Sequence, residues 1–502
     1  MKVSRRDLLH CVAAGAGVRL SRAEAQVTPD LVRFHPELEP LVVLIERTPR
    51  ERCAEVIVEQ FRSGVSYRQA MAALFLAGIR NINPQPPGFA LHCVFVIHSS
   101  HLISLEAPAD LRLLPFFYAL DNFKTAQERD RGQATGDYTM RATHGALSAG
   151  ETASAELSAA MENWDVERAE RAIVSLARSR SGSEAFDLLW RYGARDYRNI
   201  GHKAIYVANA HRTLQAIGWQ HAEPVLRSLT RSLVAFGKSE QVNGYKFEDQ
   251  CYRGNLELIA KTLPKMTTAW TAQAGDPAAV RSFCATLREA APADACAEIA
   301  GRLASNRSST AEIWDAVHLS AAELCMRARG AAAIVGIHAV TSTNALHHAY
   351  QAASGPASRL LSLLQAAGWV AQFRTWAESR EEALRAFRIT DLEPHSEAAD
   401  TATILSRPLS DVDKAASELA GAARDISARQ GFLAGALRVT IPRANEVHYY
   451  KYLAALIEDV PLVSPEWQPH LTAASLYYLK RPMDPESEAM GRARVALRRL
   501  VA

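Results

Sequence analysis

The chain has 502 residues, of which 48% are hydrophobic and 22% are charged, which is the ordinary balance of a globular protein. This composition excludes a disordered, collagen-like or disulfide-dense chain, and the length predicts two to four domain-sized units. The formal net charge is only +3, without the basic excess that is typical of nucleic-acid-binding proteins. We therefore expect no nucleic-acid partner, and the 16 histidines become the feature to follow.

The first 25 residues are interpreted as a signal for the twin-arginine export machinery, with a disordered basic N-terminus as the alternative. The motif SRRDLL (4–9) leads into a modest apolar stretch (8–18), and AEA (23–25) offers a cleavage site. This predicts a periplasmic or secreted bacterial protein. No later segment has 18 uninterrupted apolar residues, so we expect no membrane span in the mature chain.

Cleavage would leave six cysteines, in a compartment that permits disulfides. They are Cys53, Cys93, Cys251, Cys284, Cys296 and Cys325. No C-x-x-C pair is present, so a zinc knuckle is not predicted.

The rest of the chain reads as helical, because apolar residues recur every three to four positions. PVLRSLTRSLVAF (224–236) and SRLLSLLQAAGWVAQF (358–373) are clear examples, and VFVIHSS (94–100) is the one candidate strand. Ser181 or Ser183, and Ser309 or Thr310, are expected to cap helix N-termini. We predict an all-α fold.

Four similar segments follow one another along the chain, and each begins with a histidine. These are His92, His202, His338 and His448. In the first three segments a second histidine falls nine residues later, at His101, His211 and His347, whereas the fourth has Ile457 there. Each segment has an apolar helical stretch after it, and at least three have a capped one before it. The predicted unit is a helix, a loop, a histidine helix and another helix, used four times.

The spacing of the first histidines indicates a tandem duplication. The offset from His92 to His338 (338 − 92 = 246) equals the offset from His202 to His448 (448 − 202 = 246). We therefore predict two related helical halves, residues 26–275 and 276–502, with two histidine-bearing units in each.

Two histidines nine residues apart lie 2.5 turns apart, on opposite faces of a straight helix. One helix cannot chelate an ion through both of them, but equivalent histidines of several units can converge in a helical bundle. Either the first or the second histidine of each unit would then form the site. Imidazole-rich sites suit zinc, copper, iron or haem, and the nearest carboxylates, Glu106 and Glu223, are too few for a di-iron centre. The candidate ligands are His92, His101, His202, His211, His338, His347 and His448.

Other polar residues near these positions are candidates for supporting hydrogen bonds. They are His98, Asn209, Asn344, Tyr206, Tyr452 and His348. Tyr206 and Tyr452 lie one turn after a first histidine, where filling the core is an alternative role, and His348 competes with His347 as a ligand. His318 is expected in the core and His221 in a loop. Nucleophile-elbow, Walker, H-E-x-x-H and dinucleotide-binding motifs are not found in the sequence.

The histidine segments, above all GHKAIYVANAHRTLQAIGWQHAEPVLRSL (201–229), resemble the questin oxidase-like family. The resemblance implies a helical protein with repeated histidine helices and an oxygenase activity that, in some members, opens a quinone ring. An exported oxygenase would need its reductant supplied.

Two functions are consistent with the sequence. One is an oxidoreductase or other metal-dependent enzyme acting on a small molecule, with a metal ion or haem held by histidines. The alternative is a non-enzymatic helical-repeat scaffold, similar to HEAT solenoids, whose histidines are structural. The first predicts converging histidines, and the second predicts histidines dispersed along a stacked array.

Overall fold

A computed structural model describes residues 31–131, 138–144, 147, 149–237, 250–266, 276–379, 384–395 and 400–501. The expected export signal (1–25) lies outside these residues. Within them the chain is all-α, as predicted, and no strand is assigned; an isolated bridge joins Leu31 to Arg141. The candidate strand 94–100 lies inside a helix instead, because its apolar residues are buried on every side rather than on alternate faces.

The helices of the first half come in two groups. Before residue 132 the structure has α2 (Glu39–Arg47), α3 (Arg50–Arg62), α4 (Tyr67–Asn81), α5 (His92–Glu106) and α6 (Leu114–Arg131). After it come α7 (Ala153–Glu162), α8 (Val166–Ser179), α9 (Gly182–Gly193), α10 (His202–Ile217), α11 (Ala222–Leu233) and α13 (Gln250–Thr262).

The second half is also made of helices. It begins with α14 (Pro277–Glu289), α15 (Pro292–Ala304), α16 (Thr310–Arg327), α17 (Ala333–Ala352) and α18 (Pro356–Glu378). It continues with α19 (Thr401–Ser406), α20 (Val412–Ala422), α21 (Ile426–Arg443), α22 (Val447–Asp459), α23 (Gln468–Ala474) and α24 (Glu488–Val501). Short 3₁₀ turns precede three of the histidine helices, at Phe89–Leu91, Arg198–Gly201 and Gly330–Ala332.

Helix starts follow the capping residues in the sequence. Ser66 caps α4 and Ser309 caps α16, each in a capping box with the side chain three residues later, and Ser181 caps α9. These side chains accept hydrogen bonds from first-turn N–H groups that have no partner within the helix. Each of these helices directly precedes a histidine helix, so the caps set the start of three of the four expected units.

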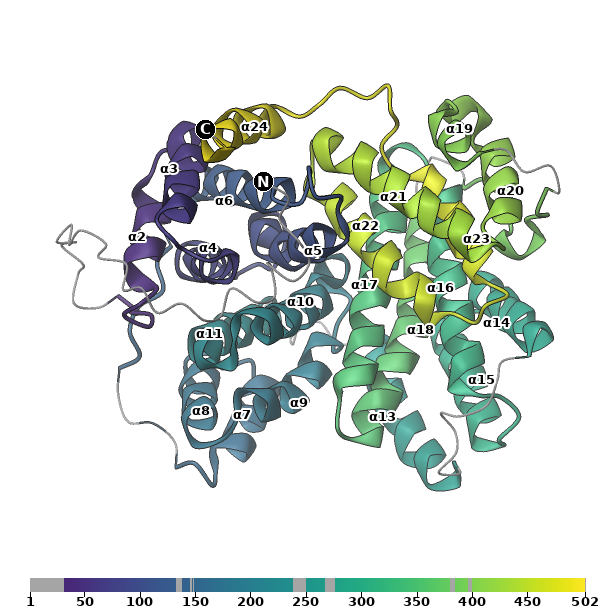
Figure 1. Ribbon diagram of the computed structural model, residues 1–502. Coiled ribbons are helices and arrows are strands. Elements are labelled where there is room, and N and C mark those ends of the chain that lie inside the picture. The colour runs from purple at the N-terminus through teal and green to yellow at the C-terminus, as the bar shows by residue number, and fades with distance from the viewer. Residues whose placement is uncertain are drawn as a thin grey trace.

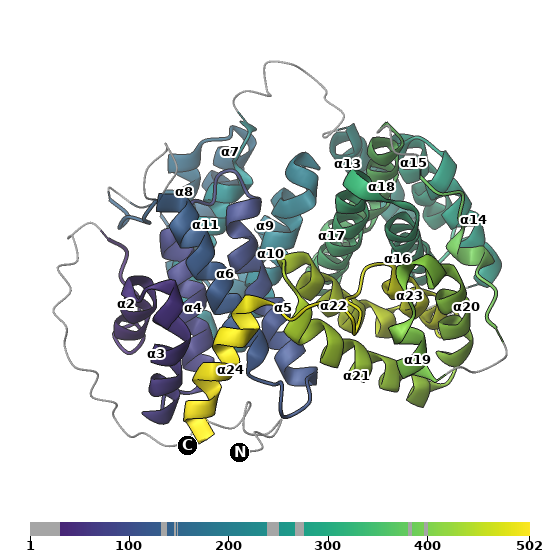
Figure 2. The same ribbon diagram turned by 90° about the horizontal axis from the view of Figure 1, so that it is seen from above.

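The four histidine helices, α5, α10, α17 and α22, lie in the middle of the molecule (Figures 1 and 2). They contact one another in a closed cycle, α5 to α10 to α17 to α22 and back to α5. Each lies between an upstream helix (α4, α9, α16 or α21) and a downstream one (α6, α11, α18 or α23) in chain order. This recurrence matches the predicted unit, whereas a common origin of the two halves stays a prediction.

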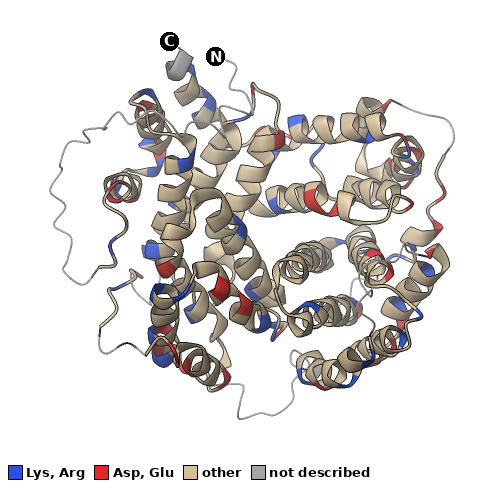
Figure 3. Ribbon diagram, turned by 60° about the horizontal axis from the view of Figure 1, so that its bottom comes forward, with Lys and Arg blue, Asp and Glu red and all other residues tan. Residues whose placement is uncertain are grey.

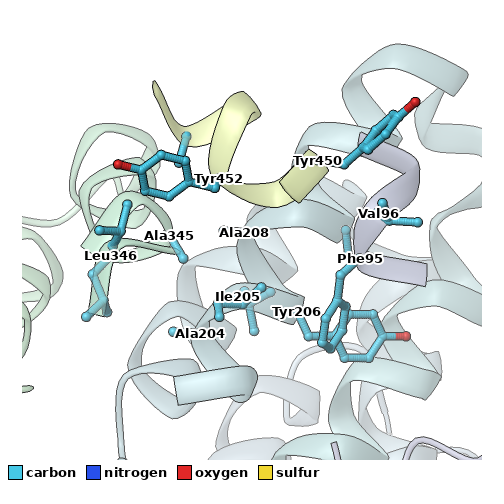
Figure 4. Close-up of a cluster of buried hydrophobic side chains, with 14 of the residues drawn as sticks. Phe95, Val96, Ala204, Ile205, Tyr206, Ala208, Ala345, Leu346, Tyr450 and Tyr452 are labelled. Carbon is cyan, nitrogen blue, oxygen red and sulfur yellow. The ribbon is translucent and has the colours of Figure 1, made fainter. Parts of the chain in front are cut away.

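Buried side chains from all four histidine helices form one hydrophobic cluster (Figure 4). Phe95 of α5 packs against Tyr206 of α10, with ring centroids 5.3 Å apart. Because both faces of these helices are covered, they are apolar around most of their circumference. By length and composition the segment Phe89–Glu106 could cross a membrane, and no other helix among the described residues could; it is largely buried, as the core helix of a folded domain also is.

Charged residues are interspersed in sign along the outer helices (Figure 3). The C-terminal helix α24 returns to the first half and packs on α3 and α6 (Figure 1). There Asp121 of α6 binds both Arg50, at 2.8 Å, and Arg492 of α24, at 2.6 Å. The last helix is therefore tied to the first half of the chain.

Candidate metal centre

The first histidine of each unit points to a common centre. His202 Nε2 lies 2.8 Å from His92 Nε2 and 3.1 Å from His338 Nε2. Around the cycle, the ring centroids of neighbours are 4.8–4.9 Å apart, with His448 between His338 and His92. We call His92, His202, His338 and His448 the histidine tetrad.

Local backbone structure explains why these rings meet. His92 and His202 are the first residues of α5 and α10, and His448 is the second residue of α22. Gly201, just before His202, has φ +79°, a left-handed conformation that suits glycine. A Cβ at Gly201 would lie only 2.9 Å from the Cβ of Ser342 on α17, so glycine also permits the close approach of α10 to α17.

His338 differs from the other three tetrad members. A glycine also precedes it, Gly336, but this glycine does not mark a helix start, since α17 begins at Ala333 and both Gly336 and His338 lie inside it. Gly336 serves packing instead: a Cβ there would be 2.6 Å from the Cα of Cys325. The glycine lets α17 lie directly against α16, and His338 follows one half-turn later.

Hydrogen bonds fix the tautomers of two tetrad histidines. His338 Nδ1 lies 2.7 Å from the carbonyl oxygen of Ile334, and His448 Nδ1 lies 2.5 Å from Oε2 of Glu446. Both Nδ1 atoms must donate, because a carbonyl and a carboxylate only accept. The Nε2 atoms of His338 and His448 therefore carry lone pairs, and His448 Nε2 has no hydrogen-bond partner among the described residues. A carboxylate or carbonyl behind an imidazole is the usual support of a metal ligand.

The tetrad imidazoles are held neutral. Burial lowers the pKa of His92, His202 and His338 well below the ordinary value, and the nearby charge of Lys451 lowers it further. Burial also lowers the pKa of His448, against the opposing effect of Glu446. Neutral imidazoles are the form that binds metal ions.

The tetrad is reached from a cavity of about 640 Å³, which His92 and His448 line. Its wall includes Phe89, whose side chain is 79% exposed, Tyr118 and the segment 486–489 that leads into α24. A cavity of this size matches those that hold small organic ligands. The arrangement thus combines converging imidazoles with an access route.

The second histidines of the units do not share one site. His101 lies beside Tyr67, with Nδ1 3.4 Å from the hydroxyl, whereas His211 Nδ1 lies 3.0 Å from His348 Nε2. His347 Nδ1 lies 2.7 Å from Nε2 of His318 and its ring stacks on Trp314. The structure therefore brings together four of the seven candidate ligands and places the other three in separate contacts.

Three predicted supporting residues belong to a second polar cluster, around Glu458. The residues that bind the Glu458 carboxylate are His98 at 3.0 Å, Arg212 at 2.9 Å and Asn344 at 3.0 Å. Arg212 also bonds Asn209 and Asn344. Burial raises the pKa of Glu458, but Arg212 and the hydrogen bonds outweigh it and lower the pKa to about 2. Among the described residues, its members form no hydrogen bond with the four tetrad rings, so this cluster stands apart from the tetrad.

The remaining residues named from the sequence lie outside the tetrad and make contacts of their own. Tyr206 donates to Ser228 at 2.7 Å, and Tyr452 packs against Tyr478. His348 pairs with His211, as given above, and His221 ends a 3₁₀ turn. Glu223, one of the two carboxylates nearest the histidine segments in the sequence, binds Arg178 at the surface.

Two residues of the site were missed from the sequence. Glu446 holds His448, and it also accepts from the hydroxyl of Tyr478 at 2.9 Å. Lys451 lies one turn after His448, and burial lowers its pKa to about 7. The available signal was a lysine inside the apolar run YYKYLAAL (449–456), a position where a charge is costly.

Comparison with protein-family models, with curated proteins and with solved structures finds no match.

Proposed function

We propose that this protein is a metal-dependent enzyme that binds a divalent first-row transition ion through His92, His202 and His338, with His448 as a fourth ligand. The observation that carries the proposal is the convergence of three buried imidazole nitrogens within 4.8 Å of one another. At metal–nitrogen bonds of ~2.0–2.1 Å, neighbouring ligand nitrogens are about 2.9–3.4 Å apart. The separations of 2.8 and 3.1 Å in the tetrad are close to this range.

The number of N–H protons in the tetrad supports binding of a cation. Two of its Nε2 atoms carry lone pairs that face the centre, and neutral imidazoles supply too few protons to satisfy all four rings. Burial of unpaired acceptors is costly, and a metal ion removes that cost. The scaffold alternative is less well supported, because structural histidines of a stacked array have no reason to meet at one point.

The reaction class follows from the ligand set and from the family resemblance. Imidazole-only sites suit copper, iron and zinc, and the cavity beside His92 and His448 admits a small organic substrate. We infer an oxidoreductase, of oxygenase type, acting on an aromatic or quinone-like compound. Insertion of one oxygen atom of O2, with reduction of the other to water, takes two electrons and two protons, which an added reductant must supply.

The test is metal stoichiometry of the full chain after loading with Fe2+, Cu2+ or Zn2+ and removal of excess ion. We expect one ion per chain, and at least tenfold weaker binding in His202→Ala, because His202 lies between two other ligands. His101→Ala, which removes a partly buried histidine outside the tetrad, serves as the control. Equal metal binding by His202→Ala and the parent protein would refute the metal centre.

The enzymatic part has its own test. Metal-loaded protein, ascorbate and a hydroxylated anthraquinone are followed with an oxygen electrode and by mass spectrometry for an added oxygen atom. We expect consumption that depends on the metal and is lost in His202→Ala. Stoichiometric metal binding without turnover of any quinone or phenol tested would leave a metal protein and refute the oxygenase.

A further inference from the structure

Cys251 and Cys296 are buried thiols on two neighbouring helices. Cys251 is the second residue of α13 and Cys296 lies in the second turn of α15, and their exposed fractions are 2% and 1%. Both are free thiols. Helices α13, α15 and α18 pack on one another, and the two cysteines lie where these three helices meet. None of these helices carries a tetrad histidine, so the pair is separate from the proposed metal centre.

A glycine inside α18 makes room for both sulfur atoms. A Cβ at Gly368 would lie 2.8 Å from Sγ of Cys251 and 3.0 Å from Sγ of Cys296, whereas carbon atoms in contact are about 3.5–4.0 Å apart. Glycine is unfavourable in the middle of a helix. Here the space that a methyl group would fill is taken by the two thiols. The two sulfur atoms therefore share one small space on the surface of α18.

Hydrogen bonds to α18 fix the position of each cysteine. One turn after Cys251, the side chain of Asn255 donates to Oε1 of Gln365 on α18, at 2.8 Å. Cys296 Sγ donates to the carbonyl oxygen of Leu364, the residue before Gln365, at 3.3 Å. Both helices are therefore held against the same turn of α18, and this arrangement keeps the two thiols together.

The pKa values of the described cysteines distinguish this pair from the rest. In four of the six, burial is the main cause of a raised pKa and no second thiol contributes. These four are Cys53, Cys93, Cys284 and Cys325. For Cys251 the main cause of the raised pKa is its hydrogen bond with Cys296, and burial adds to it. The contact between the two thiols is thus seen both in the packing and in the electrostatics.

We propose that Cys251 and Cys296 form a disulfide bond when the protein is in an oxidising compartment. The oxidant is a small disulfide such as oxidised glutathione. One cysteine thiolate attacks it and releases one glutathione, and the second thiolate attacks the mixed disulfide and releases the other. The two cysteines lose two electrons to oxidised glutathione, and the two thiol protons end on the released glutathione thiols. Because both thiols are buried, the exchange takes place before α13 packs on α15 or when these helices separate.

The bond would tie together parts of the chain that are distant in sequence. It closes a loop of 45 residues (296 − 251 = 45), and closing a loop restricts the unfolded chain and so favours the folded one. Cys251 belongs to the predicted first half of the chain and Cys296 to the second. The disulfide would therefore add a covalent link between the halves, which the tetrad joins only by side-chain contacts.

The test refolds the full chain from urea in a mixture of reduced and oxidised glutathione. The product is denatured in the presence of N-ethylmaleimide, which alkylates the remaining thiols, and its peptides are analysed by mass spectrometry. We expect a pair of peptides joined through Cys251 and Cys296, with the other cysteines alkylated. In calorimetry the oxidised protein should unfold at a Tm about 2–4 °C above that of the protein reduced with dithiothreitol.

Two serine variants complete the experiment. Cys296→Ser removes the pair but keeps a donor for the carbonyl of Leu364, and its Tm should be the same under both conditions. Cys284→Ser is the matched control and should keep the difference in Tm, because Cys284 is also 1% exposed and its thiol also faces a carbonyl, that of Ala316 at 3.8 Å.

The peptide map of the parent protein decides the outcome without any variant. Alkylation of both Cys251 and Cys296 after oxidative refolding would overturn the disulfide and leave two thiols that only fill space. A bond between another pair of cysteines in its place would overturn it as well. If Cys296→Ser does not fold, Cys251→Ala repeats the comparison of Tm.

Discussion

At the residue scale, the structure shows that burial controls the charge state of the histidines. The pKa of His101 is lowered to about 4 and that of His318 to about 3, in both cases chiefly by burial. These rings stay neutral in the folded protein at a pH where they would be protonated in the unfolded chain. Protonation of the unfolded chain therefore weakens the fold as the pH falls.

His101 allows a direct measurement of this effect. Its pKa is about 4 when folded and ~6.5 when unfolded, so between these values only the unfolded state binds the proton. The free energy of unfolding should then fall by about 1 kcal/mol for each pH unit below 6.5. His101→Gln should remove this part of the slope, as measured by urea denaturation between pH 7 and 5. The exposed His35, changed to Gln, is the control, and an unchanged slope in His101→Gln would show that the folded protein accepts the proton.

The sequence allowed seven histidines to be proposed as ligands, but it did not show which of them lie together. Histidines nine residues apart lie on opposite faces, so the pattern predicted one converging set without saying whether it contains His92 or His101. The choice depends on which face of α5 points to the bundle centre, and that is decided by packing between distant segments. Lys451 was missed because a single lysine in an apolar run is usually explained by its stem packing while its charge reaches water.

At the element scale, close contacts between helices set the position of the ligands. Helix locations were predictable because apolar periodicity and capping serines are local signals. The role of Gly336 was not, because a glycine inside a helix and a glycine at its start look alike in the sequence. Only the approach of α16, which is distant along the chain, separates the two.

Gly336→Ala tests this contact. The new methyl group would meet the backbone of Cys325, and backbone cannot move aside as a side chain can. We expect a loss of about 1–3 kcal/mol of stability and weaker metal binding, because His338 lies two residues further along α17. Urea denaturation and metal titration measure the two effects.

The control for that substitution is Gly301→Ala, inside α15, where a Cβ meets nothing within 4 Å. There the change should stabilise the protein by up to about 1 kcal/mol, since alanine favours the helix. Equal effects at the two positions would mean that α16 and α17 separate easily and that Gly336 does not position His338.

At the scale of the whole molecule, the tetrad joins the two halves of the chain. His92 and His202 come from the first half, and His338 and His448 come from the second. The equal offset of 246 residues predicted that these four positions are equivalent, and they do meet. A common evolutionary origin of the two halves stays a prediction.

A metal ion bound by both halves should stabilise the whole fold. At a free ion concentration of one hundred times Kd, the expected gain is about 2.7 kcal/mol, visible as a higher Tm in calorimetry. A chelator should reverse the gain, and His202→Ala should show none. A rise in Tm of equal size in His202→Ala would place the ion elsewhere on the protein.

One wall of the 640 Å³ cavity comes from a part of the chain that contains no tetrad histidine. Residues 486–489 line that wall, and they belong to a terminal segment that is anchored by Arg492 and Asp121 rather than by any tetrad helix. Substitutions there can reshape the entrance while the ligands and their hydrogen bonds remain as they are. If the proposed metal centre binds its substrate in this cavity, substitutions at residues 486–489 should change the range of compounds bound without loss of metal binding.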